Sequence, residues 1–179
     1  MRKMSWLCLI VSLGVLAGCA SVSKKPDWVL KGSGAFAKDK KVLYGVGIAE
    51  AVKSEALRRT TADNRAIAEI SKQVSTMSTS LMRDYMGSTS ATEEEKTSGE
   101  QYIENTVKTF ASNTITGIRI TDRWDNGKVA YSLAILDLDA LKTMADQVAQ
   151  LSQKVKEYIK TNAEKSFEKL EAEQEKRGK

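Results

Sequence analysis

The sequence predicts an α+β fold in which a three-stranded antiparallel sheet packs on one long helix. Residues 42–48 and 114–136 are rich in strand-forming side chains, and helical periodicity dominates the stretch between them. The second of these segments contains Asp125-Asn126-Gly127, a strong signal for a β-hairpin turn. Because two antiparallel strands alone are marginally stable, we expect residues 42–48 to complete the sheet. A long C-terminal helix follows the sheet.

Residues 1–18 have the features of a secretory signal peptide. Arg2 and Lys3 precede an apolar run at residues 4–17, which is shorter than the roughly 20 residues of a membrane-spanning helix. Leu16-Ala17-Gly18-Cys19 closes this run and resembles the lipobox of bacterial lipoproteins. The resemblance implies that Cys19 is lipidated and that the chain is cut before it. An ordinary secretory signal, which leaves a free thiol, is the alternative.

The expected anchor also predicts a location. The resemblance implies three acyl chains on Cys19, and stable anchoring takes more than one chain. Many Gram-negative lipoproteins that stay at the inner membrane carry aspartate after the cysteine, whereas this chain has Ala20. We therefore expect attachment to the outer membrane, facing the periplasm. The lipidated tether, residues 19–25, reaches only about 20 Å, so the domain lies close to its membrane.

The composition argues against several classes of function. The chain has no histidine, the commonest general base and metal ligand, so we expect no metal, no cofactor and no enzymatic activity. Cys8 leaves with the signal peptide and Cys19 is acylated, which leaves no disulfide. Removal of Arg2 and Lys3 lowers the net charge from +5 to about +3. No basic stripe interleaved with aromatics is present, so nucleic acid is not an expected partner.

The first expected strand, residues 42–48, places Gly45 and Gly47 on one face. One interpretation is a phosphate-cradling loop, although neither a third glycine nor a lysine-serine pair follows. The favoured interpretation is that positions without side chains let a helix pack closely on this face. Just before this strand, Trp28, Val29 and Leu30 are expected to cover the edge of the core, with a membrane-interface role for Trp28 as the alternative.

A long helix is expected from a cap at Ser54 to about Met86. Its apolar stripe consists of Leu57, Ala62, Ala66, Ile67, Ile70, Val74, Met77, Leu81 and Tyr85. The opposite face carries Arg58, Arg59, Asp63, Arg65, Glu69 and Lys72. We expect a solvated face there, with a Glu69–Lys72 ion pair. Binding of an anionic envelope component, lipopolysaccharide or peptidoglycan, by the arginines is the alternative.

The middle of the chain predicts a loop, a short helix and the hairpin. Residues 87–99 are expected to form a mobile loop, in which Glu93-Glu94-Glu95 is a weak candidate for metal ligation. A helix is expected at about residues 101–112. In the hairpin, Ile118, Ile120 and Trp124 are expected to share one face of their strand. Ala130, Ser132 and Ala134 of the other strand are small, which suits a helix lying across the sheet.

Residues 138–177 are expected to form one helix, since no proline or glycine interrupts them. A heptad seam runs along it, consisting of Leu141, Met144, Val148, Leu151, Val155 and Tyr158. Such a helix is about 60 Å long, more than a domain of this size covers. We therefore expect its distal half to project or to meet a partner. Self-association along the seam and a solvated helix are the two interpretations.

Several of these features occur together in one order: the lipobox, Pro26-Asp27-Trp28, Tyr44-Gly45-Val46-Gly47, the helix at residues 64–70 and the hairpin ending at residues 131–137. Together they resemble the LPP-twenty lipoprotein family over roughly residues 26–138. The resemblance implies a dodecin-like α+β domain at 26–138, followed by the C-terminal helix at 139–179. Family members include surface-exposed lipoproteins and ring-forming proteins of flagellar outer-membrane structures, and the resemblance supplies no catalytic residue.

Two functions follow as expectations. The first is a non-enzymatic, outer-membrane-anchored lipoprotein with a structural or assembly role in the cell envelope, a homo-oligomer or a subunit of a flagellar or other envelope complex. The second is an adaptor or activator that reaches a periplasmic cell-wall enzyme, with the long helix as the reach. An enzyme is disfavoured because nothing in the sequence places a nucleophile beside a base.

Overall fold

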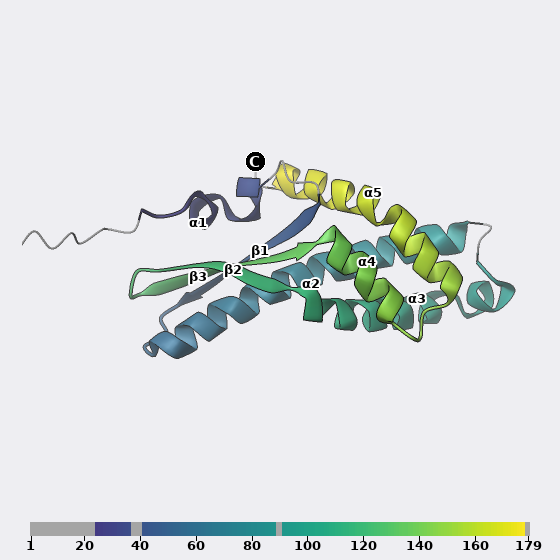
Figure 1. Cartoon of the computed structure of the whole chain (residues 1–179), viewed down its shortest axis with the longest axis horizontal. Helices are drawn as coiled ribbons and strands as arrows, with labels where there is room; N and C mark the ends of the chain where they lie inside the picture. The colour runs from purple at the N-terminus through teal and green to yellow at the C-terminus, as the bar shows by residue number, and fades with distance from the viewer. Residues whose placement is uncertain (1–23, 37–40, 89–90, 178–179) are drawn as a thin grey trace, which may run out of the picture.

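The structure is a computed structural model that describes residues 24–36, 41–88 and 91–177 (Figure 1). Residues 1–18 and Cys19, where we expect the signal peptide and the lipid, lie outside the described residues. The elements, in chain order, are α1 (Asp27–Lys31), η1 (Gly32–Phe36), β1 (Val42–Glu50), α2 (Glu55–Gly87), α3 (Glu93–Thr114), η2 (Ile115–Gly117), β2 (Arg119–Asp125), β3 (Val129–Asp137), α4 (Leu138–Gln147) and α5 (Gln153–Arg177).

The three strands form one antiparallel sheet in the order β1-β3-β2, so β1 and β2 are its two edges. Val46 of β1 pairs with Leu133 of β3, and Tyr131 of β3 pairs with Trp124 of β2. Helix α2 crosses one face of the sheet and extends well beyond it, where α3, α4 and α5 gather around it (Figure 1). The α+β fold with a three-stranded antiparallel sheet packed on a long helix is therefore confirmed.

Close packing of α2 on β1 depends on the two glycines of the strand. A Cβ at Gly45 would lie 2.4 Å from the carbonyl oxygen of Ala66, and one at Gly47 would lie 1.9 Å from that of Ala62. Since atoms cannot approach so closely, only glycine fits at either position. The expected close helix packing is confirmed. The phosphate-cradling interpretation is wrong, because α2 itself fills the space beside these glycines.

Most of the expected stripe of α2 is buried, and the expected cap at Ser54 accepts a hydrogen bond from the backbone N–H of Leu57. Leu57 is the clearest exception, because its side chain is 58% exposed, and Ile67 is half-buried. Leu57 lies in the first turn of α2. The stripe thus begins at Ala62, where β1 and β3 first contact the helix in a small cluster with Ala49 and Ala130.

The prediction that Ile118, Ile120 and Trp124 share one face is wrong, because β2 contains a β-bulge. Register with β3 shifts between Ile120 and Asp122, so Thr121 is the extra residue. A one-residue shift reverses which face the following side chains occupy. Ile120 consequently packs with the main core, whereas Trp124 belongs to the cluster on the opposite face of the sheet.

The segment after α2 is more helical than expected. Helix α3 begins at Glu93 within the predicted loop and continues to Thr114, with a kink at Gly99, whose φ is 46°. Glycine tolerates this conformation without steric cost, so the kink joins two helical pieces. The expected helix at residues 101–112 is confirmed, and the loop prediction is wrong for residues 93–99.

The C-terminal helix is present but does not project. It breaks after Gln147, and α5 starts after Ser152, whose hydroxyl accepts a hydrogen bond from the backbone N–H of Val155. The turn sends α5 back along α2. The end of α5 comes close to residues 24–36, which contain α1 and η1 and which we call the N-terminal segment (Figure 1). Most of the seam is buried in the chain's own core, together with Ile159, Ala163 and Phe167, whereas Met144 and Tyr158 are half-buried. The prediction of one uninterrupted helix whose distal half projects is therefore wrong.

Among the described residues, none of the helices combines the length and the apolar character that a membrane span requires.

Candidate functional site

The N-terminal segment covers the face of the sheet opposite α2. Trp28 is only 5% exposed, and its indole nitrogen donates a hydrogen bond of 2.9 Å to Asp122 of β2. Phe36 stacks on Tyr44 with ring centroids 4.0 Å apart. The core-covering role of Trp28 and Val29 is thus confirmed. Leu30 differs, because its side chain is 69% exposed.

Lys25, near the start of the described chain, lies beside the same face. Its ammonium nitrogen is 5.5 Å from the Trp124 ring centroid and 5.6 Å from that of Tyr131, distances typical of cation–π contacts. These two rings also contact each other edge to face. The chain therefore enters the domain next to the β2–β3 hairpin, which fixes where the tether meets the folded part.

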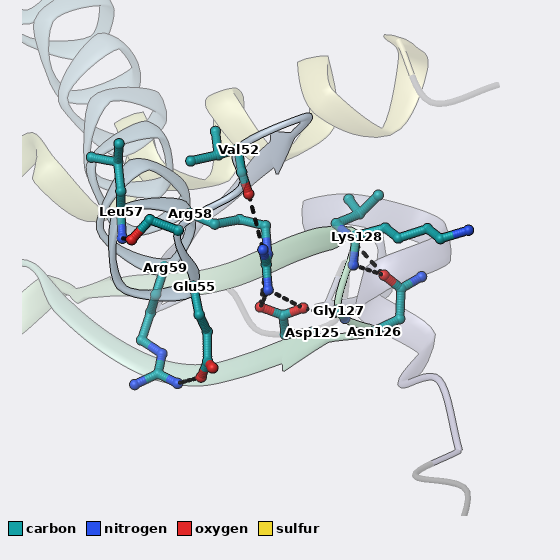
Figure 2. A network of polar contacts seen from close by, with 11 residues as sticks. Val52, Glu55, Leu57, Arg58, Arg59, Asp125, Asn126, Gly127 and Lys128 are labelled. Carbon is teal, nitrogen blue, oxygen red and sulfur yellow. Dashed lines mark hydrogen bonds and ion pairs between the residues drawn. The ribbon is translucent and has the colours of Figure 1, made fainter.

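The expected solvated face of α2 is only partly present. Arg59, Arg65 and Lys72 are exposed as expected, whereas Arg58 joins the helix to the sheet. Arg58 is 5% exposed and donates hydrogen bonds to both carboxylate oxygens of Asp125, at 3.0 and 3.2 Å, and to the backbone oxygen of Val52 (Figure 2). Its neighbour Arg59 turns to the surface and pairs with Glu55 (Figure 2). Arg58 thereby locks the hairpin turn to the start of α2, and it is not available to an anionic partner.

A second polar cluster lies one turn further along α2. Asp63 accepts hydrogen bonds from Arg123 of β2, at 2.9 and 3.0 Å, and from the buried hydroxyl of Ser132 of β3, at 2.6 Å. Burial raises the pKa of Asp63, but the hydrogen bonds from Arg123 and Ser132 and the nearby arginine charges outweigh it, so the pKa lies below 3.8. A carboxylate held in this way is a poor proton acceptor.

The same helix reaches the free edge of β1 with three side chains. Gln73 donates a hydrogen bond of 2.9 Å to the backbone oxygen of Tyr44. The backbone N–H of Val46 donates one of 2.6 Å to Glu69. Arg65 donates to the backbone oxygen of Ile48. These residues are spaced four apart on α2 and contact every second residue of β1.

A groove of about 560 Å³ runs beside this edge. The N-terminal segment and β1 supply apolar side chains, among them the exposed Leu30 and Ile48. Helix α2 supplies the polar side, including Glu69, Lys72 and Gln73, and Leu170 of α5 also lines the groove. We call this feature the edge groove. Residues of the N-terminal segment, β1, α2 and α5 all line it.

Glu69 does not form the expected ion pair with Lys72, because its carboxylate bonds the backbone of β1 instead. Burial raises the pKa of Glu69 above its ordinary value of 4.5, and the hydrogen bond from Val46 opposes part of this rise. The side-chain oxygen of Gln73 is buried with no hydrogen-bond partner among the described residues. Glu69 and Gln73, which both bond β1, are thus partly buried on the polar side of the edge groove, and their burial is energetically unfavourable.

A second groove, of about 970 Å³, separates α2 from α3. The hydroxyls of Ser71 and Thr79 line it but donate to carbonyl oxygens of their own helix, four residues back. Such bonds satisfy the hydroxyls locally, and they leave neither hydroxyl directed at a ligand in the groove.

No group of three or more potential metal-ligating residues occurs among the described side chains. Glu93 and Glu94 lie in the first turn of α3, on the surface. Within the part of the chain that the structure describes, the pair closest to a nucleophile beside a base is Ser132 with Asp63. Ser132 is buried beneath α2 and its partner is held by Arg123. The geometry therefore accounts for this pair as a structural hydrogen bond.

The three contacts to the edge of β1 were not predicted from the sequence. The available signal was the spacing of Arg65, Glu69 and Gln73, which places polar side chains four residues apart beside the apolar stripe. The predicted lipidation site, Cys19, lies outside the described residues.

The architecture defines the class of protein: an α+β domain with a three-stranded antiparallel sheet packed on a long helix. Within that class, the chain belongs to the LPP20 lipoprotein family, whose sequence model matches residues 26–137. This match covers well over half of the chain and confirms the resemblance seen in its motifs. No curated protein sequence matches the chain. The protein is accordingly a lipoprotein of the cell envelope.

Proposed function

We propose that this chain is anchored by lipid on Cys19 to the outer membrane, faces the periplasm, and has a non-enzymatic structural or assembly role. One observation carries the proposal: the family match at residues 26–137 begins seven residues after a cysteine in a complete lipobox. A lipidated cysteine so close to the domain keeps the protein at the membrane surface. Ala20 in place of aspartate supports the outer membrane rather than the inner one.

The polar chemistry of the domain supports a non-enzymatic role. Arg58, Asp63 and Glu69 are engaged in contacts between α2 and the sheet. Each of these contacts ties together elements that are distant in the sequence, as expected for a rigid building block. A homo-oligomer, or a subunit of a flagellar or other envelope complex, is the form of assembly that we propose.

The adaptor alternative depended on the C-terminal helix as a reach toward a periplasmic enzyme. Helix α5 instead packs on α2, with Phe167 2% exposed. Assembly through the heptad seam loses support for the same reason, because most of that seam lies in the core. We therefore place the assembly surface on other parts of the domain.

The anchor and the assembly are tested separately. Cells grown with an alkyne-tagged fatty acid should label the wild-type chain, and Cys19→Ser should abolish the label and release the protein from the outer-membrane fraction. Labelling of Cys19→Ser equal to wild type would refute the anchor. For assembly, crosslinking in intact cells should give mainly self-crosslinks or crosslinks to an envelope complex. A wild-type chain that stays monomeric in cells and makes no such crosslink contradicts the assembly role.

A further inference from the structure

Strand β1 is an edge strand without protection in its own sequence. Exposed sheet edges offer unpaired backbone groups to other strands, and proteins usually blunt them with charges, prolines or bulges. Residues 42–49 are uncharged and contain no proline, and their register with β3 is continuous. The other edge, β2, carries Arg119, Asp122, Arg123 and Asp125 and has a bulge. The two edges of one sheet therefore differ in their intrinsic protection.

The backbone of β1 is covered by side chains of α2. Gln73, Glu69 and Arg65 bond to Tyr44, Val46 and Ile48, respectively. Four residues of an α-helix rise about 6 Å, and two residues of a strand advance about 6.6 Å. Because the two spacings nearly match, side chains four apart on α2 can meet every second residue of β1. This arrangement imitates the hydrogen bonds of a neighbouring strand.

Close approach of the helix makes these contacts possible. Gly45 and Gly47 allow the backbone of α2 to approach that of β1, as the clash of any added Cβ shows. At that distance, the side chains flanking the buried stripe extend past the strand to its free edge. The glycines and the three polar residues thus act as one device.

We propose that Arg65, Glu69 and Gln73 form an edge guard that prevents β1 from pairing with β1 of a second copy of this chain. An antiparallel pair of identical strands is self-complementary, and the uncharged run at residues 42–49 imposes no repulsion on such a pair. The guard occupies one of the two backbone groups that such a pair would use at each of Tyr44, Val46 and Ile48. Any assembly under the proposed function then uses surfaces other than this edge. The edge guard does not depend on the lipid anchor.

The test removes the guard in the mature chain, residues 19–179, carrying Cys19→Ser. The variant Arg65→Ala/Glu69→Ala/Gln73→Ala is compared with Lys72→Ala/Thr76→Ala. The control residues line the same groove on the same helix, and the hydroxyl of Thr76 donates to the backbone oxygen of Lys72 rather than to β1. Light scattering over a concentration series measures association beyond that of the wild-type chain. We expect the guard variant to associate at concentrations at least tenfold lower, and the control to match wild type.

Hydrogen exchange at the Val46 amide distinguishes edge pairing from other association. In the dilute guard variant, exchange should be at least tenfold faster than in wild type, and protection should return as the concentration rises. A folded guard variant with fast exchange and wild-type association at every concentration overturns the proposal. The proposal is also overturned if the control variant Lys72→Ala/Thr76→Ala associates as strongly as the guard variant.

If the triple variant fails to fold, Glu69→Ala and Glu69→Gln test the same contact with a smaller change. Glutamine keeps a side-chain oxygen that can accept from Val46, whereas alanine does not. Glu69→Ala should therefore associate and expose the Val46 amide, and Glu69→Gln should behave as wild type. Equal behaviour of these two folded variants in both measurements refutes the guard.

Discussion

Replacement of Gly47 by alanine should destabilise the protein severely, although it adds one methyl group. The added Cβ would lie 1.9 Å from the carbonyl oxygen of Ala62 and 2.4 Å from the backbone nitrogen of Ala66. Both atoms belong to the backbone of α2, so no side-chain rotation relieves the clash and the helix must move away from the sheet. Overpacking of a rigid core typically costs about 1–3 kcal/mol, and we expect a loss of about 3 kcal/mol in unfolding free energy.

Gly87→Ala is the matched control. No atom lies within 4 Å of a Cβ at Gly87, which is the last residue of α2. Alanine has the higher helix propensity, so this variant should be as stable as wild type or up to about 1 kcal/mol more stable. Urea denaturation of the mature Cys19→Ser chain measures both free energies, and a loss of about 3 kcal/mol corresponds to a melting temperature about 6–12 °C lower. A Gly47→Ala variant within about 1 kcal/mol of wild type would show that α2 does not pack on β1 as described.

Three further predictions concern the contacts of α2 and α5. Arg58→Ala should cost about 2 kcal/mol or more in unfolding free energy, because it leaves the carboxylate of Asp125 without its arginine partner and with only the backbone N–H of Gly127. Arg59→Ala at the surface should cost at most about 0.5 kcal/mol, and equal losses of the two variants in urea denaturation would contradict the locking role of Arg58. Since the pKa of Glu69 is raised above 4.5, its contribution to stability is fully present below that pH and is lost as the pH rises through the folded-state pKa. Urea denaturation at pH 4 and pH 7 should therefore show that the unfolding free energy of Glu69→Gln increases relative to that of wild type as the pH rises. A decrease relative to wild type over the same pH range would refute the burial of Glu69. Phe167→Ala should cost about 3–5 kcal/mol if α5 packs in the core, with the exposed Lys169→Ala near neutral, and a small loss for both would mean that α5 projects.

The elements of the fold were largely predictable because their signals are local. Asp125-Asn126-Gly127 fixes the hairpin turn, and the alternation in residues 129–136 identifies the faces of β3. The pair Gly45 and Gly47 correctly indicated a helix packed against the strand. In each case, the pattern lies within a few residues and reflects one face of one element. The family resemblance also rested on such short motifs.

The failures arose where distant parts of the chain decide the structure. The bulge at Thr121 reverses the face of Trp124, and a single residue out of register has no strong sequence signal. The heptad seam at the C-terminus was consistent with either a straight helix or two helices folded on α2, because both bury the same stripe. Ser152 was the one local clue to the break, as a hydroxyl that caps α5.

The candidate site was the least predictable feature. Arg65, Glu69 and Gln73 look like an ordinary solvated face in sequence, since polar residues beside an apolar stripe usually contact water. Their true partners are backbone groups of a strand that lies 17 to 29 residues earlier in the chain. These side chains reach that edge because four residues of a helix and two residues of a strand span nearly the same distance, which becomes relevant only once α2 packs on β1.

The small cluster that holds the N-terminal segment on the sheet allows the tether between Cys19 and the domain to have a short form and a long form. Trp28, Val29 and Leu133 form a cluster separate from the main core, so the segment can peel away under tension while the sheet and helices stay packed. Residues 26–41 would then add roughly 55 Å of extended chain to the tether of about 20 Å. Pulling on the domain would first release this extra length, and only greater force would unfold the core. An optical trap should record the release as a first, short extension step, which Trp28→Ala removes.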